Sequence, residues 1–535
     1  MTKSSLSGLL FRMKSSVWRY KAIQENRRGK ILLKKLITVF LWLILAAGIY
    51  WCNVSTQDKK EQERVEEDDT VKPKEAVKER EGETAQTEEI SRTDALSDTI
   101  RVLIKTNGFQ GIYHGELKVI CDNGLIVEHG ETVRECAGGE EYVLDKSSFA
   151  NASEPVKITG KNQGTVRIVN LKRNAPVSYR GVLECYDTSE GIVLVNELNV
   201  EEYLYGVVPS EMPSSYPPEA LKAQAISART YTYFHKKSYA YPQWRANVDD
   251  STSFQVYKNI EETAEAVLAV NETKNELLTY EGEVIESFYY STSGGYNGGA
   301  RVWSEQQTLA DEYLFETGEE LFAKNNAKGE DAYQNFIDNG NPSDAEFGEA
   351  WYRWQYDKSL EGEACRKFLK HLYDLSKLQP QKVRIRSQYL SKEKLLEEGM
   401  IEDIRILNRE KSGLVTGLLI KTPNFMISVK TQHTIRQALG MAGDTLVKKD
   451  GAQYTMGDVL ASAYFYIEKR YGNTGDDKNA ESGDTLKGIV IHGAGLGHGC
   501  GMSQNGAKCL ANQGFTAYEI LAYYYNGAIK SVDDL

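Results

Sequence analysis

Apolar residues follow three patterns along the chain, and each pattern predicts a different kind of element. The first is an unbroken apolar run at residues 36–51, LITVFLWLILAAGIYW, which contains no charged residue. A membrane-spanning helix usually needs about 20 apolar residues. Lys34 and Lys35 can reach the bilayer surface and Trp51 can lie at the far interface, so we expect a transmembrane helix over residues 36–54. A long basic segment before the run, and no Ala-x-Ala site after it, favour an uncleaved anchor over a signal peptide.

The second pattern consists of short apolar runs separated by Gly, Asn or Asp, which predicts strands joined by turns. These runs occupy residues 100–106, 115–124, 164–172, 179–187 and 191–200. A valine-rich run at Val207 and Val208 is interpreted in the same way, as a strand. The stretch IEDIRILNREKSGLVTGLLIKT, at residues 401–422, repeats the strand pattern later in the chain.

The third pattern is helical spacing. In PPEALKAQAISARTYTYFHKK, residues 217–237, apolar or small residues recur every three or four positions. Ser214 or Ser215 can cap this helix, and the proline pair fits its first turn. Residues 320–398 are charged and mostly helical in pattern. Near the end of the sequence, TAYEILAYYY opens with the residues of a capping box, Thr516 and Glu519.

Together these patterns predict an α+β fold of mostly antiparallel strands with packed helices. We expect a β-rich part at residues 100–200, and a mixed region at residues 201–535 that contains a charged helical insertion at about 320–398. No repeat of fixed period is present.

Charge is distributed unevenly along the 535 residues, which carry a net charge of −12. Residues 1–35 carry +9 and residues 55–98 carry −7, which leaves −14 for residues 99–535. The basic segment before the apolar run predicts a cytoplasmic N-terminus, with everything after Cys52 outside the cell membrane. An acidic ectodomain argues against nucleic acid as a partner.

Residues 55–99 contain few apolar residues and no aromatic one, so they cannot bury enough surface to fold. We interpret them as a disordered charged linker, with an end-to-end reach of roughly 40 Å. Six cysteines follow the linker at wide spacing, without a Cys-x-x-Cys motif. They exclude a zinc ribbon or a redox pair, but leave both disulfides and free thiols open.

A glycine-rich segment, IHGAGLGHGCGMSQNGA at residues 491–507, has glycine at every second position from 493 to 501. If it is extended, one face has no side chains and lets another backbone or a polymer chain approach closely. Gly-x-Gly-x-x-Gly fails at its third glycine from every start, which excludes a dinucleotide loop. His498 lies close to Cys500, but no third orienting group is visible. We therefore expect His498 to shape the site through local hydrogen bonds.

Two further stretches invite a functional interpretation. STSGG, residues 291–295, is not a Gly-x-Ser-x-Gly motif; its amides and hydroxyls suit sugar hydroxyls, and a plain turn is equally open. Glu211, in VVPSEMPSSYPPEAL, stands between the valine run and the proline pair. Pro213 restricts Met212 to extended geometry. The neighbouring apolar residues can raise the pKa of Glu211 and the downstream helix can lower it.

The segments 201–233, 249–257 (DDSTSFQVY), 291–295 and 495–527 together resemble the stage II sporulation protein D family, in the same order. The resemblance is strong over about residues 179–295 and 493–527. It implies a lytic transglycosylase that cuts peptidoglycan between MurNAc and GlcNAc, prefers strands without stem peptides and serves engulfment during sporulation. It also implies peptidoglycan glycan strands, a cell-wall amidase and other membrane proteins of the engulfment machinery as partners.

The resemblance assigns the acid of its Glu-Met-Pro motif to Glu211, and associates Arg229 with substrate or function. The other candidates for substrate binding are Ser291, Ser293, Gly294, Gly295, His498 and Gln504, with Lys222 near the cleft. A lone acid suits this chemistry. Ordinary glycosidases use two carboxylates, whereas here the muramyl C6 hydroxyl attacks C1 and one glutamate serves first as acid and then as base.

The chain departs from the family at one place. Some relatives hold zinc with His and Cys near the segment that contains Asp249, Asp250, Ser253 and Phe254 here. Because this segment has no Cys or His, we predict no metal and no cofactor. Two other roles stay open: a non-catalytic amidase enhancer that binds glycan, and a structural tether between membrane and wall.

Overall fold

The computed structural model describes residues 97–149, 154–303, 309–314, 330–472 and 486–535. The predicted transmembrane helix, most of the predicted linker and the cytoplasmic tail lie outside these ranges. The chain divides into two units, Met1–Glu79 and Arg80–Leu535, and every described residue belongs to the second. Within the described ranges, no helix combines the length and the apolar character needed to cross a bilayer.

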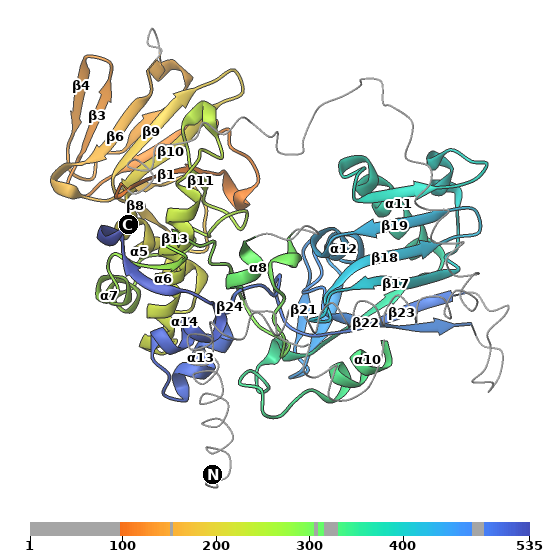
Figure 1. Cartoon of the computed structure of the whole chain (residues 1–535). Coiled ribbons are helices and arrows are strands. Elements are labelled where there is room, and N and C mark those ends of the chain that lie inside the picture. The colour runs from red at the N-terminus through yellow and green to blue at the C-terminus, as the bar shows by residue number, and fades with distance from the viewer. Residues whose placement is uncertain (1–96, 150–153, 304–308, 315–329, 473–485) are drawn as a thin grey trace, which may run out of the picture. The chain divides into compact units, whose positions relative to one another are not determined.

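Residues 99–199 form strands, as their alternating pattern predicts (Figure 1). The strands are β1 (Thr99–Ile104), β2 (Leu117–Ile120), β3 (Leu125–His129), β4 (Thr132–Cys136), β5 (Tyr142–Leu144), β6 (Val156–Gly160), β7 (Val166–Ile168), β8 (Ser178–Tyr179), β9 (Val182–Asp187) and β10 (Ile192–Asn199). One sheet has the order β11-β1-β10-β9-β6-β3-β4, where β11 is Val248–Asp249, and a second has the order β5-β2-β7-β8. The pairs are antiparallel except for β1 with β11. The predicted α+β class with mostly antiparallel strands is confirmed.

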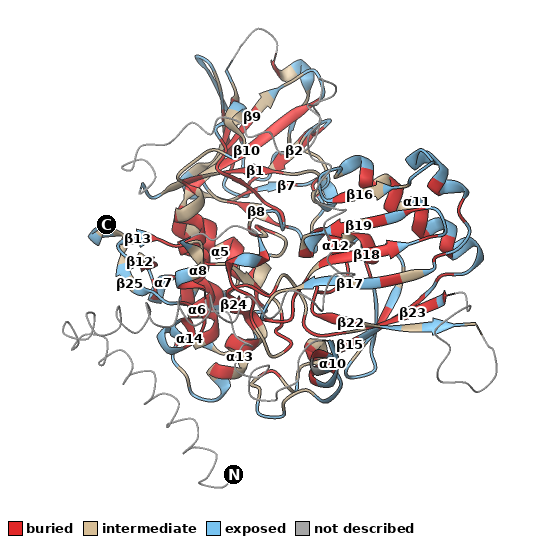
Figure 2. Ribbon diagram, turned by 45° about the vertical axis from the view of Figure 1, so that its right-hand side comes forward, coloured by how far each residue is buried: buried red, intermediate tan, exposed pale blue. Residues whose placement is uncertain are grey.

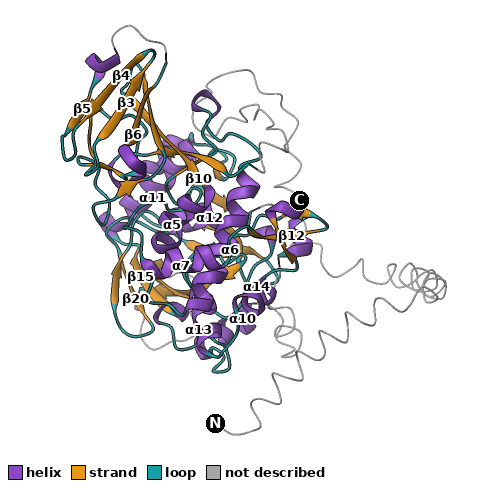
Figure 3. Ribbon diagram, turned by 90° about the vertical axis from the view of Figure 1, so that its left-hand side faces the viewer, coloured by secondary structure: helices purple, strands orange, loops and turns teal. Residues whose placement is uncertain are grey.

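A group of helices follows, gathered around α6 (Figure 3). The helices are α5 (Val200–Glu211), α6 (Pro218–His235), α7 (Ala264–Glu272), α13 (Gln504–Asn512) and α14 (Ala517–Tyr524). Helix α6 packs against the other four and against β12 (Glu276–Tyr280). Its alanines at 220, 223, 225 and 228 are fully buried. Small side chains let neighbouring elements approach from several sides, which explains why this helix is buried almost all round.

Two small sheet pairings, β12 with β25 and β14 with β24, hold the two ends of this group together. Strand β12 pairs with β13 (Glu283–Val284) and with β25 (Ala528–Ser531). Strand β14 (Tyr289–Tyr290) pairs in parallel with β24 (Met502–Ser503). Segments separated by more than 200 residues in the sequence therefore lie side by side.

The intervening chain builds two further sheets, with the orders β21-β20-β15-β23-β22 and β16-β19-β18-β17. The strands are β15 (Trp354–Ser359), β16 (Val383–Arg386), β17 (Asp403–Arg409), β18 (Val415–Lys421), β19 (Met426–Lys430), β20 (Thr445–Lys448), β21 (Gln453–Thr455), β22 (Phe465–Tyr471) and β23 (Leu486–Gly493). The helices are α8 (Ala310–Tyr313), α10 (Glu330–Asn339), α11 (Gly362–Leu378) and α12 (Gln432–Leu439). The segment predicted to be mostly helical, at about 320–398, thus also contains β15 and β16.

Two local predictions are wrong. Val207 and Val208 lie inside α5 rather than in a strand, because Asn199 caps this helix through Glu201 N and the first turn carries two acids that suit the helix dipole. Helix α6 begins at Pro218 without a side-chain cap, so neither Ser214 nor Ser215 has that role. The capping box at Thr516 and Glu519 is confirmed.

Candidate active site

Glu211 is the last residue of α5 and stands at a corner between two helices. Met212 takes extended geometry, with φ −130° and ψ 131°, as Pro213 after it requires. Pro209 lies in the last turn of α5, and Ser210 Oγ donates to the Gly206 carbonyl at 2.7 Å. The chain therefore leaves the helix abruptly, and the carboxyl group projects from a fixed point.

Three main-chain N–H groups of the DDSTSFQVY segment and the residues just after it hold this corner. Val256 N donates to Glu211 Oε1 at 2.6 Å, Lys258 N to the Gly206 carbonyl at 3.2 Å, and Asn259 N to Ser210 Oγ at 3.1 Å. At Gly206, an added Cβ would lie 2.7 Å from the Tyr257 ring. The close approach of the two segments therefore needs glycine at this position.

Burial raises the pKa of Glu211 to about 7, although the Val256 N–H and the Gln504 side chain act in the opposite direction. Burial disfavours the charged form, and here it outweighs the two hydrogen bonds. The negative charge of Glu211 contributes to the raised phenol pKa values of Tyr203, Tyr231 and Tyr289, so these rings lie near it. Glu211 is a partly buried carboxyl group that is substantially protonated near neutral pH.

Gln504 is brought to Glu211 from the far end of the sequence. Its Nε2 donates to the Glu211 main-chain carbonyl at 3.0 Å, and it also approaches Gln224 Oε1 at 3.5 Å. Gln504 begins α13, which Ser503 caps through Gly506 N. The prediction that Gln504 belongs to the site fits this placement, and its part in binding substrate stays a prediction.

The glycine-rich segment is not an extended strand with one bare face. Beyond β23 its glycines at 495, 497, 499 and 501 have φ values of 75°, 116°, 79° and 78°, which only glycine adopts readily. An added Cβ would lie 2.7 Å from the Thr292 carbonyl oxygen at Gly495 and 1.9 Å from the Phe288 carbonyl oxygen at Gly501. The glycines therefore let the protein's own backbone approach, and that space is not open to a glycan.

The STSGG stretch also uses its polar groups internally. Ser293 N donates to Glu346 Oε1 at 2.9 Å, and Ser293 Oγ accepts from Gly295 N at 2.9 Å. Ser291 Oγ bonds with Thr292 Oγ1, and Gly294 is packed against Ala494. These contacts join the stretch to neighbouring segments of the protein, and the binding of sugar by Ser291, Ser293, Gly294 and Gly295 stays a prediction.

His498 has the local structural contacts expected of it. Its Nε2 lies 2.9 Å from the Tyr289 carbonyl, and its Nδ1 accepts from Cys500 N at 3.2 Å. Nε2 therefore carries the proton. Burial lowers the pKa of His498 to about 3, and its ring packs against Trp303 at 4.9 Å between centroids. A neutral imidazole with both nitrogens engaged orders this loop and has no free nitrogen for substrate.

The side chain of Arg229 is fully buried, and its part in binding substrate stays a prediction. Its guanidinium forms a bidentate pair with Glu201, at 2.8 Å to Oε1 and 2.7 Å to Oε2. It also donates to the Val270 carbonyl at 3.0 Å. Arg229 joins α6 to α5 and to the end of α7. Lys222, suggested to lie near the cleft, pairs with Glu219 and Glu272 on the same group of helices.

Glu346 is a residue of the site region that the sequence patterns did not reveal. It is 6% exposed and accepts from Ser293 N at 2.9 Å and from Ser503 Oγ at 2.6 Å. Burial raises its pKa to about 8. One neutral carboxyl group thus links STSGG to the start of α13, which carries Gln504. Glu346 lies in a segment without a recognisable motif, so the sequence alone did not single it out.

Partners already surround the acids of the segment where some relatives hold zinc. Asp250 forms a fully buried pair with Arg173 at 2.6 Å, and Asp249 accepts from Tyr241 at 2.7 Å and lies 3.6 Å from Lys105 Nζ. Among the described residues, no group of three or more His, Cys, Asp or Glu is arranged to hold a metal ion. The absence of zinc stays a prediction.

The six cysteines after the linker are all free thiols, which answers the question that their spacing left open. Cys121, Cys136, Cys185, Cys365 and Cys500 are buried. Burial raises the pKa of Cys500 far above its usual range. A thiol of this kind has little nucleophilic thiolate, so a cysteine-based reaction beside His498 is disfavoured.

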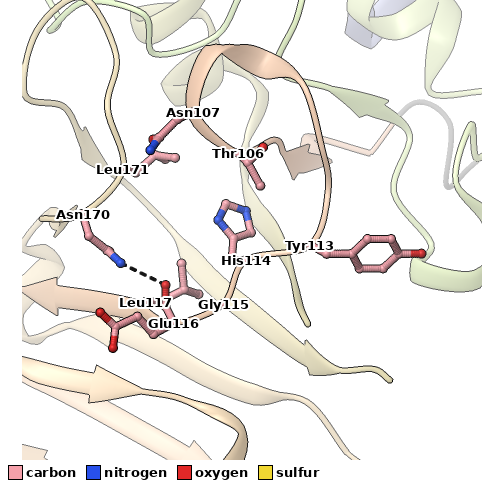
Figure 4. A pocket seen from close by; sticks show the side chains of 9 residues that line it. All are labelled: Thr106, Asn107, Tyr113, His114, Gly115, Glu116, Leu117, Asn170 and Leu171. Atoms are coloured by element: carbon pink, nitrogen blue, oxygen red, sulfur yellow. Dashed lines mark hydrogen bonds between the residues drawn. The ribbon is translucent and has the colours of Figure 1, made fainter. Parts of the chain in front are cut away.

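A cavity of about 340 Å³ lies in the β-rich region, away from the motifs. It is formed between β1, β2 and the turn after β7, where the side chains of Thr106, Asn107, His114 and Asn170 gather (Figure 4). Asn170 donates to the Glu116 carbonyl at 3.0 Å, and Tyr113 points away from the group. None of these residues belongs to the Glu211 corner.

Comparisons with known proteins bear on the motifs directly. Residues 188–280 match the family model "SpoIID: Stage II sporulation protein", a span that includes Glu211 and the DDSTSFQVY segment. Stage II sporulation protein D of Bacillus subtilis is 28% identical over 355 residues, 64% of this chain and 76% of that protein. The amidase enhancer of the same organism is 28% identical over 333 residues, 61% of this chain.

A third relative, an uncharacterized protein of Brachyspira hyodysenteriae, is 39% identical over 127 residues, 23% of this chain. The matched span covers 34% of that protein and 39% of the amidase enhancer. The predicted family resemblance is confirmed: with its motifs in place around the end of α5, the chain carries a domain of the SpoIID, stage II sporulation protein D, family.

Proposed function

We propose that this protein is a membrane-anchored lytic transglycosylase of peptidoglycan that acts in cell-wall remodelling during sporulation, with Glu211 as its acid and base. The observation that carries the proposal is the state of one carboxyl group. Glu211 is partly buried at a fixed corner, and burial raises its pKa to about 7. A general acid at neutral pH needs this property.

The surroundings of Glu211 support a mechanism with one acid. Burial raises the pKa of Glu211, whereas the Val256 N–H and the Gln504 side chain lower it. No second described carboxyl group contributes to this pKa. A partner carboxylate within a few ångströms would raise the pKa further by like-charge repulsion. Ordinary glycosidases position two such groups.

The reaction then proceeds in two proton transfers. Protonated Glu211 donates to the glycosidic oxygen as the bond from C1 to that oxygen breaks. The muramyl C6 hydroxyl forms a new bond to C1, and its proton passes to the Glu211 carboxylate. The products are a GlcNAc hydroxyl end and a 1,6-anhydroMurNAc end, and Glu211 is again protonated. The Val256 N–H stabilises the carboxylate between the two transfers.

The experiment uses the purified protein and glycan strands whose stem peptides have been removed. Mass spectrometry of the products is expected to detect 1,6-anhydromuramyl ends with the wild-type protein and none with Glu211→Gln. No such ends from the wild-type protein would contradict the enzymatic proposal. Equal amounts from both proteins would leave the activity and reject Glu211 as its acid.

A second candidate function comes from the relative named amidase enhancer. In that role the chain binds peptidoglycan and promotes the action of a cell-wall amidase without cutting sugar bonds. The free thiols, the buried Arg229 and the closed STSGG stretch are compatible with either role. Measuring peptide release by an amidase, with and without Glu211→Gln, separates them: an enhancer needs no acid, so the variant would remain fully effective.

A further inference from the structure

Positive charge gathers on one surface of an otherwise acidic protein. Residues 366–394 contain nine Lys or Arg and two Asp or Glu, whereas residues 99–535 together carry −14. The segment runs through α11, β16 and η7 (Lys392–Glu397), and α11 packs against both of the others. A stretch that is continuous in sequence is therefore also compact in space.

Most of these cations form no ion pair with a described residue, although Lys377 Nζ lies over the Tyr373 ring at 4.3 Å. Lys367, Lys370 and Lys394 pair with Glu363, Asp374 and Glu397. The remaining six form no ion pair with a described residue and are exposed or partly exposed: Arg366, Lys377, Lys382, Arg384, Arg386 and Lys392. Exposed Lys430 joins them, because its N–H donates to the Lys382 carbonyl at 2.9 Å. We call these seven residues the basic surface.

The positive charges of the basic surface contribute to the pKa shifts of neighbouring groups. Lys382 and Arg436 contribute to lowering the pKa of His433, after burial. Lys377 and Lys392 contribute to lowering the pKa of Glu393. Figure 2 shows that α11 turns one exposed side away from its sheet. Lys377 and Lys392 thus act on the same carboxylate, and Lys382 acts on His433 in α12.

A hollow lies beside the basic surface. It has a volume of about 650 Å³ and is lined by Leu390, Lys394, Glu397, Glu398, Gly399, Met400, Pro423 and Asn424. Tyr389, at 90% exposure, is next to it in the sequence, and Leu390 is 42% exposed. Exposed aromatic and aliphatic side chains beside polar groups suit the apolar faces and hydroxyls of sugar rings.

An alternative explanation covers only part of this surface. Strand β16 is at the edge of its sheet, and charged residues on an edge strand prevent pairing with another chain. That argument accounts for Arg384 and Arg386. It does not account for Arg366 and Lys377 on α11 or for Lys392 on η7.

We propose that the basic surface and its adjacent hollow form a second glycan-binding site, which holds a distant part of the same peptide-free strand through its lactyl carboxylates. The identity of this ligand rests on the function proposed above. A peptide-free strand carries a lactyl carboxylate on every muramyl residue, so it is a regular polyanion with sugar rings between its charges. The seven cations complement the carboxylates, and Tyr389 and the hollow complement the rings.

The positive charge of the basic surface would also attract a nucleic acid or an anionic bilayer. The hollow contains Glu397 and Glu398, and acids among the lining residues disfavour a dense phosphate surface. A bilayer bound by charge alone would leave the hollow without a role. The observations therefore favour a chain with spaced carboxylates.

The test is binding of the full-length protein to insoluble peptide-free glycan, measured by co-sedimentation at several salt concentrations. The variant is Arg366→Glu, Lys377→Glu, Lys382→Glu and Lys392→Glu combined. Its matched control is Arg167→Glu, Lys172→Glu, Lys274→Glu and Lys530→Glu, which changes the same residue types, all exposed and outside any ion pair with a described residue. Both proteins have the same net charge.

We expect the first variant to lose about tenfold in affinity at low salt and the control less than about twofold. The loss should shrink as salt screens the charges. Chitin, which has the same linkage and no lactyl group, should bind weakly to every protein. Equal losses in both variants, equal binding of chitin, or the same losses on anionic lipid vesicles would each overturn the proposal.

Because binding is measured without turnover, the outcome is separate from that of the function proposed above. Absence of 1,6-anhydro ends from the wild-type protein would reject the transglycosylase and leave the binding result unaffected. Conversely, if the enzyme is active and the four charge reversals leave its binding to glycan unchanged, the second site alone is rejected.

Discussion

Glu211 and Glu346 are two buried carboxyl groups with similarly raised pKa values and different surroundings. Glu211 ends a helix at a corner that remains partly exposed, and it accepts from the main-chain N–H of Val256. Glu346 is 6% exposed and accepts hydrogen bonds from two residues of the sequence motifs. A raised pKa reports burial in both cases. The accessibility of the carboxyl group distinguishes one that is available for chemistry from one that holds loops together.

The largest effect should come from Glu211→Gln. The amide cannot donate a proton to the glycosidic oxygen, so the rate of 1,6-anhydro product formation should fall by about 10²–10⁴-fold. The amide can still accept from Val256 N, so the midpoint of thermal unfolding should change little. A large drop in that midpoint would show that Glu211 resembles Glu346 in being structural.

Arg229→Ala should produce the largest loss of stability. It leaves Glu201 buried without its bidentate partner, which typically costs about 3–5 kcal/mol of unfolding free energy. Lys222→Ala on the same helix is the control, because its ion pairs are more exposed and should cost about 0–1 kcal/mol. Denaturant unfolding measures both. If the Arg229→Ala protein were stable and bound substrate more weakly, the role in substrate binding that the family resemblance gives Arg229 would be supported.

Replacing Glu346 should have an intermediate effect that depends on the replacement. Glu346→Ala leaves the Ser503 hydroxyl without its acceptor and the Ser293 N–H with Ser503 Oγ alone, at 3.2 Å. We expect a cost of about 1–3 kcal/mol of unfolding free energy. Glu346→Gln retains a neutral acceptor and should be close to wild type in denaturant unfolding. If the glutamine variant were as unstable as the alanine variant, the ionised form of Glu346 would be the one that matters.

The last effect is a dependence of stability on pH. The folded pKa of Glu346, about 8, lies above the ordinary value of 4.5, so the folded state holds a proton that the unfolded state has lost. This contribution to stability is complete below about pH 4.5 and is lost as pH rises to about 8. Glu346→Gln has no group that titrates at this position. The unfolding free energy of the wild type minus that of the variant should therefore decline as pH rises over this window. A flat difference in unfolding free energy would contradict the assignment.

The sequence predicted the elements with a strong local period, such as α6, α14 and the strands of residues 99–199. It failed at Val207 and Val208, because β-branched residues in a helix are permitted when a cap and tertiary packing favour it. The alternating glycines showed that something approaches closely, but not that it is residues 288–294. The charge of Arg229 and its spacing on the helix do not show whether its side chain is buried or exposed, since a helix accommodates arginine in either position.

The same limit applies to the site itself. Glu211 could be singled out because prolines fix its neighbours, which is a local signal. Glu346 could not, because its role depends on partners 53 and 157 residues away in the sequence. Long-range hydrogen bonds leave no period and no motif in the segment that supplies them.

The pairing of Gln504 with Glu211 spans 293 residues, and β25 closes on β12 across a similar separation. Contacts of such high order form late, because a long loop must close before they contribute. As the chain emerges from the ribosome, the corner of α5 is made long before α13, which supplies Gln504. The surroundings of Glu211 are therefore incomplete until that helix has been made and has folded onto the corner.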